Sequence, residues 1–236
     1  MELLTSPEAW IAFATLTALE LVLGIDNIIF ISILVDKLPA DQRESARRTG
    51  LYMAMFMRIG LLLGLSWIVG LVKPMLTLLG HEVSGRDAVL LLGGLFLIWK
   101  STTEIHHALE GGEDGHSSQS KQTLWSVIVQ IMVIDIVFSL DSIITAVGMV
   151  EHLEIMIAAV VSSVGLMMLF ARAIGEFVAA HPTIKMLALS FLVVVGVVLI
   201  AEGFEHHIPK GYIYFAMAFS LGVEMLNIRL RKKSGA

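Results

Sequence analysis

Two stretches of the chain carry the same pattern of acidic and apolar residues. The first reads Glu20-Leu-Val-Leu-Gly-Ile-Asp26-Asn27-Ile-Ile, and the second reads Asp135-Ile-Val-Phe-Ser-Leu-Asp141-Ser142-Ile-Ile. In each, five residues separate two carboxylates, and a small polar side chain follows the second one. Oxygen donors of this kind suit hard divalent cations such as Mg²⁺, Ca²⁺ and Mn²⁺. The candidate metal ligands are Glu20, Asp26, Asn27, Asp135, Asp141 and Ser142.

Both acidic stretches lie in apolar runs long enough to cross a membrane. Of the 236 residues, 56% are hydrophobic and 16% are charged, and the mean hydropathy is +0.83. A soluble domain is about one quarter charged, and runs of roughly 20 apolar residues indicate membrane-spanning helices. A carboxylate at the centre of a bilayer costs roughly 2.5–3.5 kcal/mol, so four cost on the order of 10 kcal/mol. Intramembrane acids usually serve an ion pathway, and we interpret these four in that way.

We predict an all-α polytopic membrane protein with seven spans, for which the lipid bilayer is the first partner. The predicted spans are Trp10–Val35, Leu51–Val72, Ala88–Trp99 (extending towards His107), Leu124–Val150, Ile155–Ala180, Ile184–Ala201 and Tyr212–Ile228. Several Trp and Tyr side chains stand near these ends, where amphipathic rings prefer to lie. The N-terminus lacks the positive segment of a cleaved signal peptide, so we expect the first span to be retained.

The basic residues predict how these spans are oriented in a bacterial inner (plasma) membrane. With the N-terminus outside and the C-terminus cytoplasmic, eleven of the 16 Lys and Arg fall in cytoplasmic segments, three fall outside and two fall within spans. This is the positive-inside distribution. The chain has no basic patch of the kind that nucleic acid requires. Because it also has no cysteine, thiolate metal sites, disulfides and cysteine nucleophiles are excluded.

The similarity between the two acidic stretches extends to neighbouring spans. Met-Phe-Met-Arg58-Ile-Gly is similar to Leu-Phe-Ala-Arg172-Ala-Ile-Gly, and Gly94 and Gly196 occupy matching places in the third and sixth spans. Because each half has three spans, the second half must enter from the opposite side, which gives an inverted repeat of the kind that many transporters have. The predicted parts are residues 1–110 (first three-helix repeat), 111–123 (flexible linker rich in His and acids), 124–207 (second repeat) and 208–236 (seventh helix and basic cytoplasmic tail).

Helix geometry separates the two acids of each stretch. At about 100° per residue, Glu20 and Asn27 share one helical face, whereas Asp26 lies about 120° away from Glu20. The second stretch has the same spacing. The acids therefore converge if the two helices break near Gly24 and Ser139, or else they serve two positions along one path.

Charge balance gives the two intramembrane arginines a role. The four acids carry four negative charges, whereas Arg58 and Arg172 carry two positive charges. A divalent cation or two protons would neutralise the two remaining negative charges. We expect Arg58, Arg172 and Ser139 to support the metal ligands without binding the metal themselves. The alternative is that the acids only pair with the arginines and hold the helices together.

The two acidic motifs, on two three-helix halves with one further span, resemble the TerC family of integral membrane proteins, in the LysE/TerC-like transporter superfamily. The resemblance covers the chain from about Trp10 to Ile228. Members of the family are linked to manganese efflux and, in some bacteria, to metal loading of exported proteins. The resemblance implies that the six candidate ligands form a metal site. We expect no appended cytoplasmic domain after the seventh span, and therefore none of the regulatory functions of longer members.

The function predicted from these observations is export of a divalent cation, with Mn²⁺ as the substrate. The mechanism would be alternating access at a carboxylate site near the membrane midplane, with protons exchanging for metal at the same acids. Mn²⁺ or another hard cation is then a substrate, and neither a tightly bound cofactor nor a catalytic residue is expected. The His-rich segment from Glu104 to His116 is interpreted as a flexible polar loop.

Two alternatives use the same acids differently. In the first, the chain is not an enzyme or a transporter but a partner of other membrane proteins, as a homo-oligomer or with the secretion machinery, and its acids are structural. In the second, Asp26 and Asp141 are the catalytic pair of an intramembrane aspartyl protease. The sequence motifs that accompany such a pair are missing, and the protease needs neither the other two acids nor the repeat.

Overall fold

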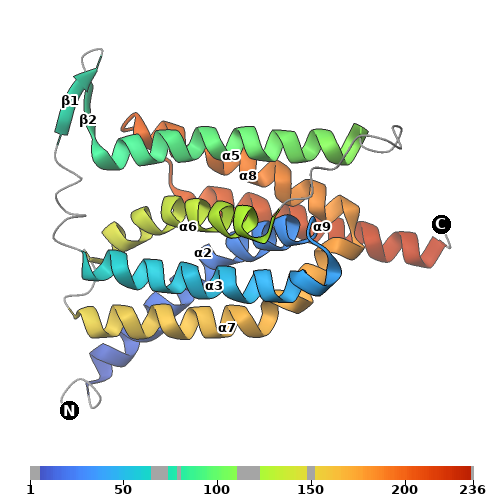
Figure 1. Cartoon of the computed structure of the whole chain (residues 1–236), viewed down its shortest axis with the longest axis horizontal. Helices are drawn as coiled ribbons and strands as arrows, with labels where there is room; N and C mark the ends of the chain where they lie inside the picture. The colour runs from blue at the N-terminus through green and yellow to red at the C-terminus, as the bar shows by residue number, and fades with distance from the viewer. Residues whose placement is uncertain (1–5, 65–73, 79–80, 111–122, 148–151, 235–236) are drawn as a thin grey trace. The chain divides into compact units, whose positions relative to one another are not determined.

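The computed structural model describes residues 6–64, 74–78, 81–110, 123–147 and 152–234 (Figure 1). Over these residues the chain forms seven helices and a hairpin of two strands. The elements are α2 (Pro7–Val35), α3 (Ala40–Leu63), β1 (Pro74–Leu78), β2 (His81–Ser84), α5 (Gly85–Glu110), α6 (Leu124–Val147), α7 (Leu153–Ala180), α8 (Pro182–Gly203) and α9 (Lys210–Ser234). The prediction of an all-α polytopic membrane protein is confirmed.

Five of the described helices contain stretches long and apolar enough to cross a membrane. These stretches are Pro7–Val35, Gly85–Leu109, Leu153–Ala180, Pro182–Gly203 and Gly211–Arg231. α6 adds a shorter apolar stretch, Leu124–Leu140. The second predicted span, Leu51–Val72, begins within α3 and continues past residue 64, beyond the described range.

The two helices that carry the acidic motifs are unbroken. α2 begins where the Ser6 hydroxyl accepts a hydrogen bond from the Ala9 amide at 3.4 Å and Pro7 opens the first turn, a favourable start for a helix. Its 29 residues stay helical through Gly24, and the 24 residues of α6 stay helical through Ser139. Neither helix therefore has the break near Gly24 or Ser139 that the sequence allows.

α3 begins eleven residues before the predicted span, because its first part is a polar helix rather than a membrane segment. Glu44 accepts hydrogen bonds from Arg47 at 2.7 Å and from Arg48 at 2.8 Å. Such pairs, three and four residues apart, stabilise a helix in water. Arg43 closes the preceding turn by donating to the carbonyl oxygens of Asp36 and Leu38, at 2.8 and 3.0 Å.

The antiparallel hairpin of β1 and β2 lies between α3 and α5 in the chain (Figure 1). Pro74 pairs with Ser84 and Leu78 with His81, with one irregularity in the register next to Pro74. Nothing in the pattern of spans predicts this hairpin, since strands of five and four residues are too short to show a clear alternation of polar and apolar residues.

The chain divides into two compact units. Unit 1 comprises Met1–Arg86 and Ser118–Phe177, and unit 2 comprises Asp87–Ser117 and Val178–Ala236. Unit 1 therefore holds α2, α3, the hairpin, α6 and nearly all of α7, and unit 2 holds α5, α8 and α9. Each unit takes helices from both predicted repeats. A repeat concerns symmetry rather than contact, so the predicted domain boundaries stay a prediction.

Within unit 1, α6 packs along α3 and against α2 (Figure 1). The contact with α3 is close at Gly50, where an added Cβ would lie 2.8 Å from Ile131. α7 approaches α2 at Gly24, where an added Cβ would meet the Met167 side chain at 1.9 Å. Small residues thus bring the helices near enough for polar side chains inside the unit to reach one another.

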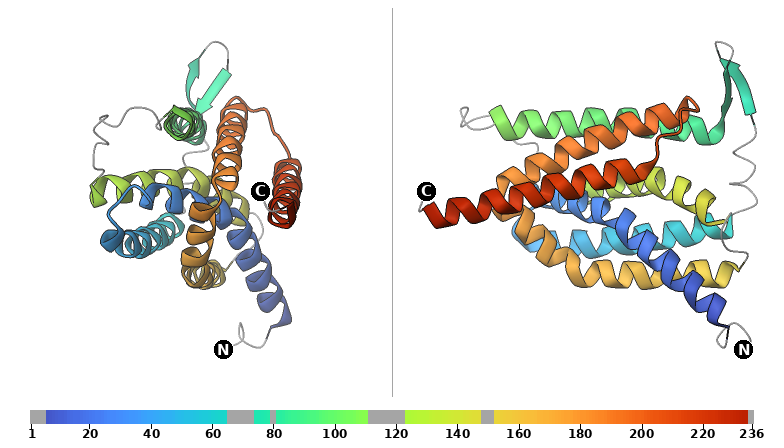
Figure 2. Two further views of the ribbon diagram at one scale, coloured as in Figure 1. Left: turned by 90° about the vertical axis from the view of Figure 1, so that its right-hand side faces the viewer. Right: turned by 180° about the vertical axis from the view of Figure 1, so that it is seen from behind.

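Within unit 2, α5 and α8 touch through backbone at two glycines. A Cβ added at Gly94 would lie 2.6 Å from the Gly196 oxygen, and one added at Gly196 would lie 2.8 Å from the Gly94 oxygen. The next neighbours match as well, because Gly94 meets Ile200 and Gly196 meets Ile98. This reciprocity is what a local two-fold axis between two antiparallel helices produces. α9 runs beside α8 (Figure 2), and none of its apolar span is buried.

Candidate metal centre

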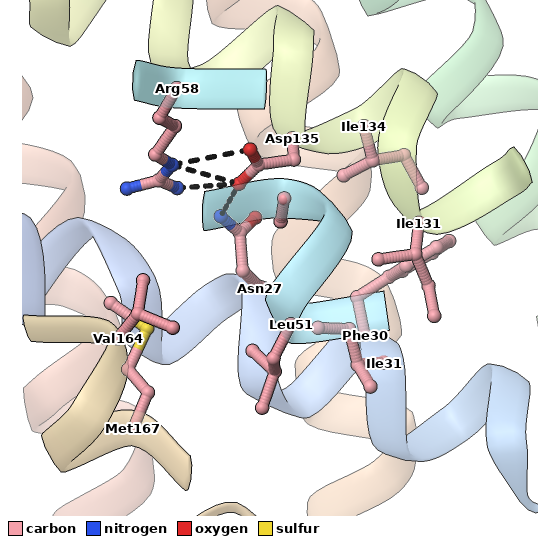
Figure 3. A pocket seen from close by; sticks show the side chains of 11 residues that line it. Asn27, Phe30, Ile31, Leu51, Arg58, Ile131, Ile134, Asp135, Val164 and Met167 are labelled. Carbon is pink, nitrogen blue, oxygen red and sulfur yellow. Dashed lines mark hydrogen bonds and ion pairs between the residues drawn. The ribbon is translucent and has the colours of Figure 1, made fainter. Parts of the chain in front are cut away.

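One arginine in unit 1 joins acids from two other helices. Arg58, on α3, donates from Nη1 to Glu20 Oε2 on α2 and from Nη2 to Asp135 Oδ1 on α6, the latter at 2.5 Å. Its Nε lies 3.1 and 3.2 Å from the two Asp135 oxygens (Figure 3). Arg58 points inward because it shares the buried face of α3 with Leu51 and Ala54, at the spacing that places residues on one side of a helix.

The Asp135 carboxylate is fully engaged. Besides the three contacts from Arg58, its Oδ1 accepts from Asn27 Nδ2 at 3.1 Å and its Oδ2 accepts from the Ser139 hydroxyl at 3.2 Å. A carboxylate offers about four lone-pair positions, and these five contacts occupy them. Ser139 stands one helical turn after Asp135, so its hydroxyl reaches back along α6 to the same carboxylate.

These charges are buried. Glu20 is 7% exposed, Arg58 4% and Asp135 4%. Buried charges are tolerated only when they are paired and hydrogen-bonded. Two carboxylates around one guanidinium leave a formal charge of −1 on these three side chains, so the cluster still favours positive charge.

Two polar atoms on α2 beside this cluster are buried without a hydrogen-bond partner among the described residues: Asn27 Oδ1 and Thr17 Oγ1. Thr17, Glu20, Gly24 and Asn27 follow one another at helical spacing and are all buried, so they form one face of α2. Thr17 was not among the predicted site residues, although its place one turn before Glu20 is visible in the sequence. An unsatisfied buried oxygen costs free energy that a ligand would recover.

A small cavity adjoins the cluster (Figure 3). The cavity volume is about 10 Å³, which is close to the least that holds one water molecule. One end of the cavity is polar and the rest is apolar. Its lining consists of Asn27, Phe30, Ile31, Leu51, Ala54, Arg58, Ile131, Ile134, Asp135, Val164 and Met167.

The structure brings part of the predicted ligand set together. Glu20 and Asp135 meet through Arg58, and Asn27 donates to Asp135. The side chains of the other three predicted ligands, Asp26, Asp141 and Ser142, lie outside the described residues. The supporting residues Arg58 and Ser139 both contact Asp135.

Arg172, the predicted counterpart of Arg58, is not in this cluster. Its Nε donates to Glu176 Oε1 at 2.8 Å, and its side chain is 71% exposed. Among the residues that the structure describes, no three His, Asp or Glu side chains converge as a ready metal site. The two described acids that do converge are held by a guanidinium instead. The donors present are carboxylate, amide and hydroxyl oxygens, the ligand types of Mg²⁺, Ca²⁺ and Mn²⁺.

Comparison with known proteins identifies relatives over the whole chain. The UPF0053 inner membrane protein YgdQ of Escherichia coli K12 is 58% identical over 231 residues, which cover 98% of this chain and 97% of YgdQ. A UPF0053 protein of Haemophilus influenzae is 58% identical over 232 residues and 98% of each chain. The UPF0053 inner membrane protein YoaE of Escherichia coli K12 is 50% identical over 228 residues, which are 96% of this chain but 44% of that longer protein.

No solved structure matches the chain. The family described as "Integral membrane protein TerC family" matches residues 5–234, which includes both acidic motifs, Arg58 and Arg172. The resemblance seen in the motifs is thereby confirmed over nearly the full length. This chain belongs to the TerC family of integral membrane proteins.

Proposed function

We propose that this protein is a multi-pass transporter of the bacterial inner membrane that exports a hard divalent cation, with Mn²⁺ as the substrate. Support for the location comes from relatives that are named inner membrane proteins and from five long apolar helices. The proposed orientation, with the N-terminus outside and the C-terminus cytoplasmic, rests on the distribution of basic residues.

The observation that carries the proposal is the buried cluster of Glu20, Asp135 and Arg58, with Asn27 and the cavity beside it. Stability alone does not account for it, because apolar residues of similar size often stabilise a core as well as a buried ion pair does. The cluster joins the apolar helices α2 and α6 to α3, carries an excess formal negative charge and adjoins Asn27 Oδ1, which has no hydrogen-bond partner among the described residues. Those are the properties of a cation site at membrane depth.

Alternating access would expose this site to each side of the membrane in turn. The reciprocal contact of Gly94 and Gly196 supports an inverted repeat, and in transporters of that type one repeat moves against the other around a site near the midplane. Protons would replace the cation at the carboxylates on the return step. Mn²⁺ flux into proteoliposomes should then depend on a pH gradient, and equal fluxes with and without the gradient would remove proton coupling from the proposal.

Cellular manganese tests the function directly. In a strain that lacks this protein and is grown in excess Mn²⁺, we expect the wild-type chain to lower cellular manganese and Asp135→Asn to leave it at the level of the deletion strain. Asp41→Asn is the matched control, because Asp41 is an exposed acid on the polar start of α3, and it should act as the wild type does. Metal content is measured by mass spectrometry on cells with equal amounts of protein.

The same experiment separates export from a structural role of the acids. If Asp135→Asn is folded and abundant yet lowers manganese as well as the wild type, the carboxylate is structural and export through this site is wrong. The protein would then be better described as a partner of other membrane proteins.

A further inference from the structure

We infer that Arg58 is a built-in counter-cation that competes with the transported metal for Asp135. This inference rests on the proposed function and adds to it a residue that lowers the affinity of the site. Arg58 holds the carboxylate when the metal is absent, and it must release the carboxylate before a divalent cation binds there.

The geometry of Asp135 requires this exchange. Oδ1 accepts from Arg58 Nη2 and Nε and from Asn27 Nδ2, while Oδ2 accepts from Arg58 Nε and Ser139 Oγ. Three of the five contacts come from Arg58. A metal ion needs the same lone pairs, so it can bind Asp135 only after the guanidinium withdraws.

Charge favours the same conclusion. A divalent cation beside Asp135 would stand next to a guanidinium in a region where Arg58 is 4% exposed and water does not screen the repulsion. The two cations therefore exclude each other. Arg58 keeps a second partner, Glu20 on α2, so it can release Asp135 without losing every counter-charge.

The place for the incoming ion is beside Asp135 and Asn27. The cavity there has room for about one water molecule. This space suits a single ion and is too small for a guanidinium. Asn27 Oδ1 is buried, lines this cavity and has no hydrogen-bond partner in the described structure. It is an oxygen ligand that Arg58 does not use, and it becomes available to a cation that binds at Asp135.

A tethered competitor has opposite effects on binding and on release. It weakens metal binding because the metal must displace it. It also speeds release, because Arg58 returns to Asp135 as the metal leaves. An exporter needs release into an outer solution, so removal of the competitor should tighten binding and slow transport.

The test compares Arg58→Gln with Arg172→Gln in purified protein. We expect Arg58→Gln to bind Mn²⁺ about tenfold more tightly or better by calorimetry, since it has lost a charged hydrogen-bonding competitor. Its Mn²⁺ flux in proteoliposomes should fall. Arg172→Gln removes the exposed arginine that pairs with Glu176, and it should match the wild type in affinity.

Affinity in Arg58→Gln that is equal to or weaker than in the wild type would overturn the inference. If Arg58→Gln does not give monodisperse protein, Arg58→Lys replaces it, because an ammonium cannot span two acids as the guanidinium does. We expect Arg58→Lys to tighten binding also, and failure of both variants to fold even with Mn²⁺ present would count against the inference. Absence of Mn²⁺ binding to the wild type would instead overturn the proposed function.

Discussion

Two places where helices meet in this chain use opposite chemistry. In unit 1, α2, α3 and α6 meet through the charged side chains of Glu20, Arg58 and Asp135. In unit 2, α5 and α8 meet at Gly94 and Gly196, with backbone against backbone and the Ile98 and Ile200 side chains beside the two glycines. Both regions are buried, so solvent does not explain the difference.

The two contacts differ in whether another group can replace one of their partners. The ionic contact depends on partners that a metal ion or a proton can replace, since carboxylates accept either. The glycine contact depends on shape alone, and close-packed protein interiors are hard to compress. We therefore assign exchange of partners to the junction of α2, α3 and α6 and a fixed contact to the crossing of α5 and α8.

Loss of the charge in the ionic contact should have the largest effect. Arg58→Leu leaves Glu20 and Asp135 buried without their counter-charge, and breaking such a pair costs about 3–5 kcal/mol of stability. Arg172→Leu removes an arginine at the surface and should leave the melting temperature almost unchanged. Thermal unfolding of both variants in detergent measures the contrast, and similar melting temperatures would show that the buried cluster does not hold the helices.

An added methyl group at the glycine contact should have an intermediate effect. Gly196→Ala places a Cβ 2.8 Å from the Gly94 oxygen, and overpacking of this kind costs about 1–3 kcal/mol. The control is Gly165→Ala in α7, where an added Cβ meets nothing within 4 Å. That change should stabilise the helix slightly, by about 0.5–1 kcal/mol. Equal unfolding temperatures for the two alanine variants would mean that the crossing of α5 and α8 can adjust.

The ion pairs of Glu44 with Arg47 and Arg48 at the start of α3 should contribute least. Burial alone raises the pKa of Glu44, but the hydrogen bond from Arg48 and the charges of Arg47 and Arg48 outweigh it and hold the pKa below its ordinary value. A lowered pKa in the folded state stabilises the protein above the unfolded pKa, and this gain is lost as the pH falls through the folded value.

Because Glu44 is 42% exposed, we expect Glu44→Gln to cost less than about 0.5 kcal/mol. The measurement is the melting temperature of the wild type and Glu44→Gln between about pH 6 and pH 3. The two curves should differ above the unfolded pKa of Glu44 and meet at low pH. A difference that persists at low pH would mean that Glu44 acts through packing rather than through charge.

Much of the fold follows from the sequence because a membrane leaves few choices. Apolar runs of sufficient length must form helices, since backbone groups have no water to bind. The acids Glu20 and Asp135 stand out for the same reason, because any carboxylate in such a run needs a partner. The polar start of α3 and the short hairpin lie outside that constraint, and the pattern of apolar runs does not predict them.

The partner of the acids could not be predicted in the same way. Arg58 and Arg172 stand in similar sequences, yet only Arg58 reaches the cluster. The buried face of α7 runs through Met167, Ala171 and Gly175, so Arg172 falls one residue away from it. A shift of one residue turns a side chain by about 100° around a helix. Packing decides that shift, and packing depends on contacts between segments far apart in the chain.

α3 joins the aqueous side of the molecule to the buried cluster through one continuous helix. Arg47 and Arg58 are eleven residues apart on it and both are buried, so they share a face and lie about 16 Å apart along the axis. The backbone hydrogen bonds of an unbroken helix make this distance nearly constant. Any axial movement of α3 that starts at Glu44 and Arg47 therefore displaces the Arg58 guanidinium by the same amount, and the polar start of α3 has a mechanical connection to the buried ion pair.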